Sequence, residues 1–365
     1  MSRVLVAMSG GVDSSVAAAL LVEAGHDVVG VTMKTFCYSG TGDHPKTCCG
    51  LDGIADARRV AHALGIPHYV FDVEADFTRD VIDDFVREYA RGRTPNPCVR
   101  CNSTTKFRDL LQRGRDLDCE YVASGHYVRI SHEGGTSLLR RGTDASKDQS
   151  YFLWGLPREI LPRLHFPVGE LTKTQVRERA RELNLVTADK PESQEICFVP
   201  TGDYRDFLRT RLGPVHPGLE PGPLVRRDGT VVGQHRGYAG FTVGQRRGLG
   251  GGFPEPLYVL EIRPEGREVV VGARHELLED TVEVAGVNWL VDPPPSGTRV
   301  RVQLRYRAPA VPGTLRYEGR DRLTVELDAP HAAVTPGQSA VLFDTEQVVL
   351  GGGRIEGAFT RTGAA

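Results

Sequence analysis

The sequence predicts an α/β protein: a doubly wound parallel-sheet domain followed by two smaller β-rich domains, the last of them a β-barrel. In the first 205 residues, apolar runs of strand length alternate with stretches of helical periodicity, a pattern typical of a parallel sheet covered by helices. Beyond residue 205 the apolar runs are short and are bounded by glycine, proline and aspartate, as in antiparallel strands joined by turns. The 42 glycines and 23 prolines suit such a turn-rich region.

The elements of the first region follow one another at the spacing of strand–helix–strand units. The expected strands are Val4–Met8, Val28–Thr32, His68–Val73 and Tyr121–Ser124, and the expected helices are Val16–Ala24, Asp52–Leu64, Phe77–Tyr89 and Lys106–Leu117. Gly25 and Gly65 follow two of these helices as stop signals.

The later strands are expected at Leu224–Arg226, Tyr258–Ile262, Glu268–Val271, Val282–Val287, Val300–Arg305, Arg322–Leu327, Ser339–Leu342 and Gln347–Leu350. The change of pattern places one domain boundary near residue 205 and another near 276. We therefore expect a catalytic domain over 1–205, a β-rich linking domain over 206–276 and a barrel over 277–365, with a frayed tail from Gly357.

Composition excludes several classes of protein. The 365 residues carry 45 Lys and Arg against 47 Asp and Glu, so the chain is not a globally basic nucleic-acid-coating protein. The 40% apolar and 25% charged content is globular rather than disordered. No apolar run reaches the roughly 18 residues of a membrane span, and no targeting segment is expected before Val4. Seven cysteines then favour a reducing cytoplasm, where grouped cysteines serve catalysis or metal binding.

The strongest motif is Ser9-Gly10-Gly11-Val12-Asp13-Ser14-Ser15, between the first strand and the first helix. Two glycines allow a tight turn close to a ligand, and the amides at the helix start form an anion site. The lysine of a Walker P-loop is missing. The loop therefore suits holding pyrophosphate as a leaving group during AMP transfer better than transferring a γ-phosphoryl group.

Two cysteines stand among polar residues in what we expect to be loops, Cys101 and Cys197. An accessible thiolate can act as a nucleophile or carry a persulfide. Cys98 lies three residues before Cys101, a spacing that also fits a redox pair, half a zinc site or part of an iron–sulfur site. Cys119 is expected in the core, and Cys37, Cys48 and Cys49 flank a glycine-containing loop that we interpret as structural.

A local basic stretch surrounds the first pair of cysteines. Between Arg87 and Arg115 there are eight Lys or Arg and two Asp or Glu. A solvated helix face explains the charge equally well, but a loop that displays Asn and Cys among arginines suits an anionic polymer offering one base for chemistry. His126 follows an expected strand end, where open α/β sheets bind ligands.

Taken together, these segments resemble the bacterial tRNA-specific 2-thiouridylase family, within the N-type ATP pyrophosphatases. Besides the SGGVDSS loop, the matching segments are Thr94–Asn102, Ser124–Tyr127, Lys147–Leu153, Ser193–Phe198, Gly244–Gly250, Leu304–Arg307 and Pro336–Ser339. They extend from residue 3 to about 356, nearly the whole chain.

The resemblance implies ATP-dependent adenylation of the C2 oxygen of the wobble uridine in tRNAs for Lys, Glu and Gln, and sulfur transfer from a cysteine persulfide. It makes Cys101 the nucleophile and Cys197 the persulfide carrier, with Asp13 essential to AMP formation. The implied ATP-binding residues are Ala7, Met8, Ser9, Gly10, Gly11, Val12, Asp13, Ser14, Met33 and Gly125. The implied tRNA-binding residues are Asn96, Pro97, Cys98, His126, Lys147, Asp148, Gln149, Arg305, Tyr306 and Gln338.

The implied partners are ATP with Mg²⁺, tRNA, and a sulfur donor protein, either a cysteine desulfurase or a relay protein. No membrane partner and no resident metal ligand are expected. Three alternatives stay open: an iron–sulfur-dependent tRNA thiolase using Cys98, Cys101 and Cys197, a pyrophosphatase ligase acting on a small molecule, and a catalytically idle tRNA-binding protein.

Overall fold

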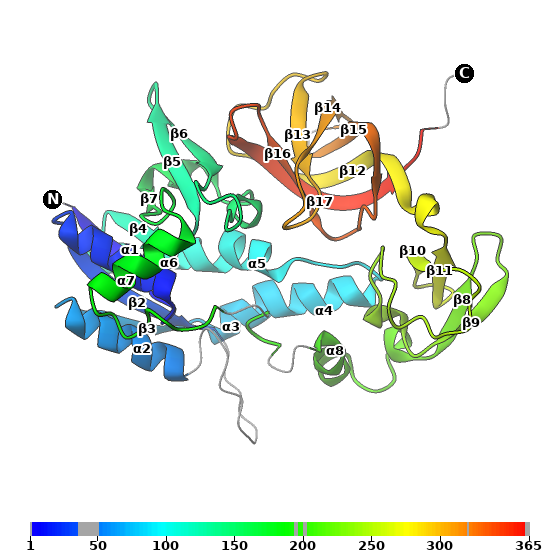
Figure 1. The fold of residues 1–365 in the computed structure, drawn as a ribbon, viewed down its shortest axis with the longest axis horizontal. Coiled ribbons are helices and arrows are strands. Elements are labelled where there is room, and N and C mark those ends of the chain that lie inside the picture. The colour runs from blue at the N-terminus through cyan, green and yellow to red at the C-terminus, as the bar shows by residue number, and fades with distance from the viewer. Residues whose placement is uncertain (1, 36–50, 193–195, 200–202, 320, 362–365) are drawn as a thin grey trace. The chain divides into compact units, whose positions relative to one another are not determined.

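The computed structural model describes residues 2–35, 51–192, 196–199, 203–319 and 321–361. The chain forms two compact units (Figure 1). Unit 1 comprises 1–82, 98–202 and 347–349, and unit 2 comprises 83–97, 203–346 and 350–365. The loop that contains Cys37, Cys48 and Cys49 lies outside the described residues.

Unit 1 is built on a five-stranded parallel sheet in the order β3-β2-β1-β4-β7. Its strands are β1 (Arg3–Ala7), β2 (Asp27–Lys34), β3 (His68–Asp72), β4 (Tyr121–Ser124) and β7 (Leu164–His165). The chain proceeds outward from β1 to β3 on one side and crosses to β4 on the other. The strand order therefore reverses between β1 and β4, where open α/β sheets place their ligands.

The helices of unit 1 are α1 (Val12–Glu23), α2 (Leu51–Ala63), α3 (Glu74–Phe77), α5 (Pro97–Arg100), α6 (Phe107–Asp116) and α7 (Lys173–Glu182), with π-helical turns η1 (Thr78–Ile82) and η2 (Cys101–Lys106). Helices α1, α2 and α6 match predicted helices with shifted ends, and the helix predicted over Phe77–Tyr89 is interrupted by η1. Helices α5 and α7 were not predicted. Helix α1 begins four residues earlier than expected because Gly11, in extended conformation, is its N-cap. Val6, Val16, Val60 and Ala123 belong to the buried core between sheet and helices.

Two sequence expectations about local structure are wrong. Asp13 is in the first turn of α1 rather than in the loop. Cys101 does not lie in a loop but opens η2, within a helical run that starts at Pro97 and continues through α6. The polar residues around Cys101 suggested a loop, but Pro97 is the first residue of α5, and a proline at the first position of a helix is favourable because its missing N–H would have no acceptor there. The hairpin β5 (Val128–Glu133) and β6 (Thr136–Arg141) was not predicted.

Unit 2 begins with α4 (Asp83–Ala90) and α8 (Tyr204–Leu212) and continues as the predicted β-rich half. A four-stranded sheet has the order β10-β11-β8-β9, with β8 (Gly222–Val225), β9 (Val231–His235), β10 (Tyr258–Arg263) and β11 (Glu268–Gly272). A closed barrel follows in the order β12-β15-β14-β13-β16-β17, with β12 (Leu278–Trp289), β13 (Arg299–Gln303), β14 (Val311–Tyr317), β15 (Arg322–Ala332), β16 (Ser339–Phe343) and β17 (Val349–Phe359). Strands β9 and β14 were not predicted, and β17 extends three residues into the tail that was expected to fray.

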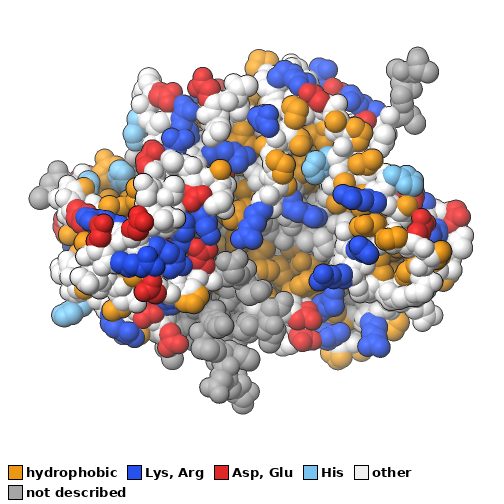
Figure 2. Space-filling model, viewed as in Figure 1, with side chains coloured by type: hydrophobic (Ala, Val, Ile, Leu, Met, Phe, Trp, Pro, Cys, Tyr) orange, Lys and Arg blue, Asp and Glu red, His pale blue; other side chains and the backbone are white. Residues whose placement is uncertain are grey.

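Part of the basic stretch is neutralised inside unit 2. The buried carboxylates Asp84 and Glu88 of α4 accept from Arg354 of β17 at 2.9 and 3.1 Å. Arg93 contacts Glu88 at 2.8 Å and Glu356 at 2.6 Å, which raises the pKa of its guanidinium. These arginines fix α4 to the barrel, so they do not belong to one open basic face. Figure 2 shows Lys and Arg interspersed with Asp and Glu on the visible surface.

No helix among the described residues is both long and apolar enough to cross a membrane.

The close approach of β4 to α1 yields a testable prediction. A Cβ on Gly125 would lie 2.6 Å from backbone atoms of Asp13 and Ser14. Gly125→Ala should therefore lower the free energy of unfolding of unit 1 by about 1–3 kcal/mol, because backbone must shift to make room. Denaturation followed by Trp154 fluorescence in a Trp289→Phe background measures unit 1.

Gly114→Ala is the matched control. Its Cβ would meet Leu5 and Cys119 at ordinary contact distances of 3.5 and 3.6 Å, inside helix α6. Alanine is the better helix former, so this variant should be neutral or stabilised by up to about 1 kcal/mol. Equal stabilities for the two variants would contradict the close packing of Gly125 on α1.

Candidate functional site: the carboxyl edge of the parallel sheet

The glycine-rich loop lies at the point where the strand order reverses. Ala7, at the end of β1, pairs in register with Ser124, at the end of β4, so the segments that follow both strands meet. Gly10 has a positive φ of 72°, and a Cβ there would lie 2.1 Å from the carbonyl oxygen of Gly53. Only glycine fits this turn. The amides at the start of α1 then face the sheet edge with no intrahelical acceptor, which makes an anion site.

Most of the loop's hydroxyl groups hold the loop itself. Ser14 and Ser15 are buried and donate to the carbonyl of Gly11 at 3.1 and 2.9 Å. Ser14 also accepts from the amide of Ser9 at 3.2 Å. Ser9 is the exposed serine of the three. These hydrogen bonds pre-form the turn.

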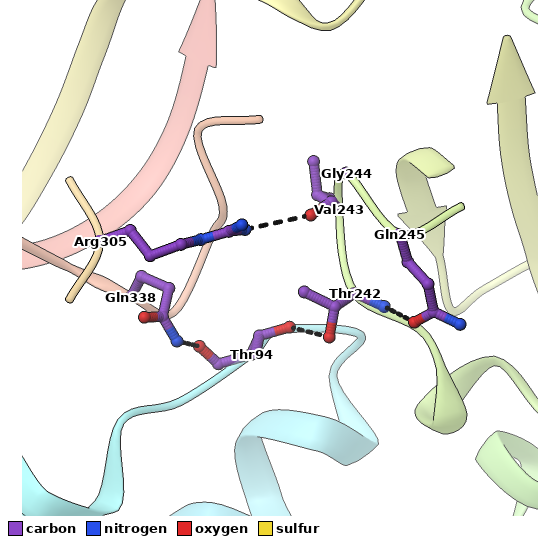
Figure 3. Close-up of a pocket in the computed structure, with 7 residues that line it drawn as sticks. All are labelled: Thr94, Thr242, Val243, Gly244, Gln245, Arg305 and Gln338. Carbon is purple, nitrogen blue, oxygen red and sulfur yellow. Dashed lines mark hydrogen bonds between the residues drawn. The ribbon is translucent and has the colours of Figure 1, made fainter. Parts of the chain in front are cut away.

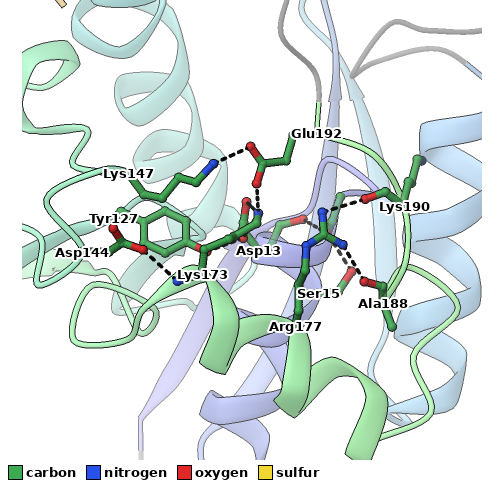
Figure 4. Close-up of polar contacts among 12 residues, drawn as sticks. Asp13, Ser15, Tyr127, Asp144, Lys147, Lys173, Arg177, Ala188, Lys190 and Glu192 are labelled. Carbon is green, nitrogen blue, oxygen red and sulfur yellow. Dashed lines mark hydrogen bonds and ion pairs between the residues drawn. The ribbon is translucent and has the colours of Figure 1, made fainter. Parts of the chain in front are cut away.

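Asp13 is the charged centre of the site (Figure 4). Lys173, the first residue of α7, donates to its two carboxylate oxygens at 2.7 and 2.9 Å. The hydroxyl of Tyr127 donates to the same carboxylate at 2.6 Å. Burial and the neighbouring Asp13 charge raise the pKa of Tyr127, so its hydroxyl stays a donor. Asp13 is thereby held in one orientation by two groups distant in sequence.

Glu192 extends this contact into a chain of charges (Figure 4). It accepts from Lys173 at 2.9 Å and from Lys147 at 2.8 Å, so its carboxylate bridges the two lysines. Burial would raise the pKa of Glu192, but hydrogen bonds from Lys147 and Lys173 lower it to about 2. The carboxylate is therefore ionised throughout the physiological range, and the lysine charges on either side of it are balanced.

The segment before Glu192 is anchored to the glycine-rich loop. Lys190 donates to the carbonyl of Gly10 at 2.9 Å and to Asp56 at 2.5 Å. Arg177 of α7 donates to the carbonyls of Ala188 and Lys190 at 2.8 and 3.2 Å. The chain that leads toward Cys197 therefore starts from a point fixed against the nucleotide loop.

His126, expected at the RNA site, is a neutral and tightly held side chain. Its Nδ1 is 2.7 Å from the Ser124 hydroxyl, and its ring packs against Phe107 and Phe166. Burial, followed by the nearby Lys106 charge, places its pKa well below the ordinary value. An imidazole in this state can offer a hydrogen bond to a base but brings no positive charge to a phosphate.

The Lys147-Asp148-Gln149 segment has two kinds of residue. The carboxylate of Asp148 is buried and accepts from Arg141 at 3.0 Å, from the Gly142 amide and from Ser150. Gln149 accepts from the Tyr127 amide at 3.0 Å. Both side chains thus shape the loop that presents Lys147, the one side chain of the three that contacts Glu192.

The described cysteines differ in accessibility. Cys98 is exposed, Cys101 and Cys197 are partly buried, and Cys119 is buried, where burial raises the pKa of its thiol. Cys119 therefore matches the expected core residue. Cys101 opens η2, which contacts α3 and η1, and Phe198 packs its ring 5.9 Å from Phe77 at the end of α3. The turn η2 that Cys101 opens and Phe198, the residue after Cys197, thus both contact α3.

Among residues that the structure describes, no three His, Cys, Asp or Glu side chains converge to hold a metal ion. Cys98, Cys101 and Cys197 do not form a ligand set in this arrangement. Mg²⁺ is commonly bound through one or two carboxylates and the phosphates of a nucleotide, and the Asp13 carboxylate beside the anion site would fit that mode.

Two of the predicted RNA residues, Arg305 and Gln338, line a cavity of about 220 Å³ in unit 2 (Figure 3). The Gln338 amide donates to the Thr94 carbonyl at 2.8 Å, and the Thr94 hydroxyl donates to Thr242 at 3.1 Å. Arg305 donates to the Thr335 hydroxyl at 2.8 Å and to the Val243 carbonyl at 3.3 Å. These contacts hold the backbone directly before Asn96. Tyr306 carries the guanidinium of Arg307 over its ring at 5.5 Å.

Two of the ATP-site predictions concern strand residues. Met8 is buried with its amide bonded to the Val31 carbonyl at 2.7 Å, and Met33 is almost buried near the end of β2. Val12 is buried at the start of α1, while Ala7 and Gly11 are partly exposed at the sheet edge. Backbone atoms, rather than the side chains of Met8 and Val12, face a ligand here.

The sequence reasoning missed Lys173, Glu192, Tyr127 and Lys190 as members of the site. Tyr127 was quoted only as part of a motif. Lys173 follows a strong helix-start signal, a capping box of Thr172 and Gln175, yet nothing in the sequence links it to a residue 160 positions away. The absent Walker lysine was the one available signal, because it indicated that a cation had to come from elsewhere.

Known families and relatives match this chain over nearly its whole length. The families described as "tRNA methyl transferase HUP domain", "tRNA methyl transferase PRC-barrel domain" and "Aminomethyltransferase beta-barrel domain" match residues 2–201, 205–273 and 279–355. A tRNA-specific 2-thiouridylase MnmA of Carboxydothermus hydrogenoformans is 48% identical over 97% of both chains. One of Geobacter metallireducens is 48% identical over 98% of both chains.

Solved structures are more distant. A 4-thiouridine synthetase–RNA complex with bound ATP has 15% identity and a TM-score of 0.38, over 57% of this chain and 50% of that chain.

The bridge at Glu192 is testable by NMR of ¹³C-carboxyl-labelled glutamate. The Glu192 signal, assigned by its loss in Glu192→Gln, should stay that of an ionised carboxylate from pH 6 down to 3.5, because the folded pKa is about 2. In Lys147→Met it should titrate at higher pH, since one of its two lysine donors is gone. Lys190→Met is the control, because Lys190 contacts Asp56 instead. A Glu192 midpoint near its ordinary value of 4.5 in the parent would contradict the bridge.

Proposed function

The chain belongs to the tRNA-specific 2-thiouridylase family, and we propose that it uses ATP to convert the wobble uridine of tRNAs for Lys, Glu and Gln to 2-thiouridine. It is accordingly a tRNA sulfurtransferase. The observation that carries the mechanism is the meeting of the Asp13 loop, the Lys173–Glu192 charges and the segment leading to Cys197 at one edge of the sheet. The sulfur would come from a donor protein, a cysteine desulfurase or a relay protein, and the reduced thiols suit the cytoplasm.

The first chemical step would activate the base. A uracil C2 carbonyl is a poor electrophile because oxide is a poor leaving group. The C2 oxygen attacks the α-phosphorus of ATP, pyrophosphate leaves, and the oxygen becomes part of an AMP leaving group. The amides at the start of α1 would hold the leaving pyrophosphate. Magnesium would enter with the phosphates, and Asp13 is the side chain placed to contact it.

Lys173 would supply the positive charge that the glycine-rich loop lacks. Its ammonium contacts both oxygens of Asp13 and one oxygen of Glu192, and its side chain is only 11% exposed. A lysine in this position can stabilise charge that develops on pyrophosphate, because it is partly desolvated and already oriented. Two carboxylates hold it in place until the nucleotide arrives.

The second step would deliver sulfur. The terminal sulfur of a Cys197 persulfide attacks C2, AMP leaves, and the base is joined to Cys197 through a disulfide. The Cys101 thiolate then attacks the Cys197 sulfur, the electron pair of the broken S–S bond stays on the C2 sulfur, and a Cys101–Cys197 disulfide forms. Alternatively, Cys101 attacks first and releases hydrosulfide, which displaces AMP. In either order the two thiols lose two electrons, and a thiol reductant must restore them.

The contacts of η2 and of Phe198 with α3 support this pairing of the cysteines. Cys101 opens a π-helical turn, a local structure often found at functional sites, and Cys197 lies in a turn next to a ring packed on α3. The predicted RNA residues would contact the tRNA: His126 and Lys147 belong to unit 1, and Asn96, Arg305 and Gln338 belong to unit 2. A three-cysteine cluster has no comparable support, and neither does a small-molecule ligase, which would have no use for two thiols here.

Adenylation can be tested with unmodified tRNA transcript and ATP. Asp13→Ala should abolish tRNA-dependent AMP formation. Lys173→Met should reduce its rate by about 10²–10³, because a preorganised charge at a developing anion is lost. The effect should fall on kcat rather than on KM for tRNA. Arg181→Met, on the same helix in a surface pair with Asp189, should react like the parent. A Lys173→Met variant with parental kcat would remove this residue from the mechanism.

The roles of the cysteines can be distinguished by the step at which the reaction of each variant stops. Cys197→Ser should form adenylated tRNA yet accept no persulfide, because the accepting sulfur is absent. Cys101→Ser should accept a persulfide on Cys197 yet release no thiolated tRNA. Cys98→Ser should keep measurable activity, and Cys119→Ser serves as a buried control. Mass spectrometry of the protein and of digested tRNA gives both readouts. Inactive Cys98→Ser protein with loss of bound iron would favour the cluster alternative.

A further inference from the structure

A second cavity in unit 2 is lined by two arginines that are not among the predicted ATP-binding or tRNA-binding residues. It measures about 550 Å³ and is lined by Gln245, Arg246 and Arg247, in the loop between Phe241 and β10. Gln245 also lines the smaller cavity of Thr94, Arg305 and Gln338, so the two cavities adjoin at this residue.

The loop that carries the arginines has a fixed backbone. The Gly244 amide donates to the Val259 carbonyl at 2.8 Å, and the Val259 amide donates back to Gln245 at 2.9 Å. The Gln245 side chain accepts from the Thr242 amide at 3.1 Å and donates to the Arg247 carbonyl at 2.8 Å. The polar atoms of the Gln245 side chain are thus used in hydrogen bonds within the turn. The two arginines are the side chains of the cavity lining that can bind a ligand.

Close packing sets the position of this loop on the barrel. Gly244 has a positive φ of 86°, and a Cβ there would lie 2.5 Å from the side chain of Ala333. A bulkier or more restricted residue would lift the loop from the barrel. Beyond it, Gly248 also has positive φ, and a Cβ there would lie 3.9 Å from the Arg205 guanidinium. A third cationic side chain therefore borders the loop.

The charges of Arg246 and Arg247 have no counter-ion in the described part of the chain. Both side chains are exposed, and neither is in an ion pair with a described carboxylate. The arginines of the turn between β8 and β9 differ: Arg226 pairs with Glu255 and Arg227 with Glu276. Two adjacent, uncompensated guanidinium groups at a rigid turn are suited to bind phosphate oxygens, each through several N–H donors.

We propose that the loop Thr242–Gly248 binds the phosphate backbone of the tRNA, with Arg246 and Arg247 contacting consecutive phosphates next to the Arg305–Gln338 cavity. The inference rests on the proposed function for the identity of the polyanion. Phosphate contacts carry no sequence information but fix the register of the nucleic acid. The loop would therefore hold the tRNA so that the selected base is presented in one position, without itself reading a base.

The test is the salt dependence of tRNA binding, measured with unmodified transcript from 50 to 300 mM KCl. Arg246→Ala/Arg247→Ala should lower the slope of log K against log salt by about 1.4–1.8, because two phosphate contacts are lost. Arg236→Ala/Arg274→Ala is the matched control, with two exposed arginines of the same unit away from the cavity; its slope should equal that of the parent. Arg246→Lys/Arg247→Lys should retain the slope, because the charges remain.

Turnover separates this proposal from the proposed function. The Arg246→Ala/Arg247→Ala variant should show a raised KM for tRNA and a near-parental kcat for AMP release at saturating tRNA. If the parent itself forms no AMP with tRNA, the proposed function fails. If the parent is active and the double variant matches the control in slope and KM, the phosphate site is refuted. Normal tRNA binding with loss only of sulfur uptake from a donor protein would also refute it, since the loop would then face a protein partner.

Discussion

The contact between Lys173 and Asp13 is the interaction on which the candidate site depends. It joins α7 to the first turn of α1, two elements 160 residues apart, and it fills both oxygens of the carboxylate. Removing Lys173 would leave the partly buried Asp13 carboxylate with the Tyr127 hydroxyl but no lysine, which is more costly than losing a surface pair. The same lysine reaches Glu192, so the nucleotide loop, helix α7 and the segment toward Cys197 share one set of charges.

The sequence was informative where a residue's role is local. The parallel sheet, the barrel after residue 277 and the glycine-rich turn before the first helix all follow from periodicity, turn residues and the strand–glycine–helix order, and the structure confirms them. Local cues also misled: the polar residues around Cys101 suggested a loop, but Pro97 starts a helix that leads into η2. Lys173 and Glu192 escaped detection because their partners are set by the packing of α7 on α1, and a single sequence contains no record of which lysine meets which carboxylate.

The same distinction applies to charge. A count of lysines and arginines over 87–115 predicts a basic face, yet Arg93 pairs with Glu88 and Glu356 in unit 2. Net charge along the chain says nothing about which cations are already balanced. Arg246 and Arg247 are better candidates for binding RNA phosphates, although the region around them has an ordinary composition. Their loop is rigid, and their charges have no counter-ion among the described residues.

The position of Glu192 gives the two chemical steps a physical connection. Its carboxylate holds Lys173, which faces the nucleotide loop, and Lys147, a predicted RNA contact, and it begins the segment that leads to Cys197. When ATP draws Lys173 toward phosphate, or tRNA draws Lys147 toward its backbone, the balance of charge on Glu192 changes. A carboxylate that loses one of its two lysines is less firmly fixed. Glu192 would thus couple the predicted nucleotide site, through Lys173, to the predicted RNA contact at Lys147.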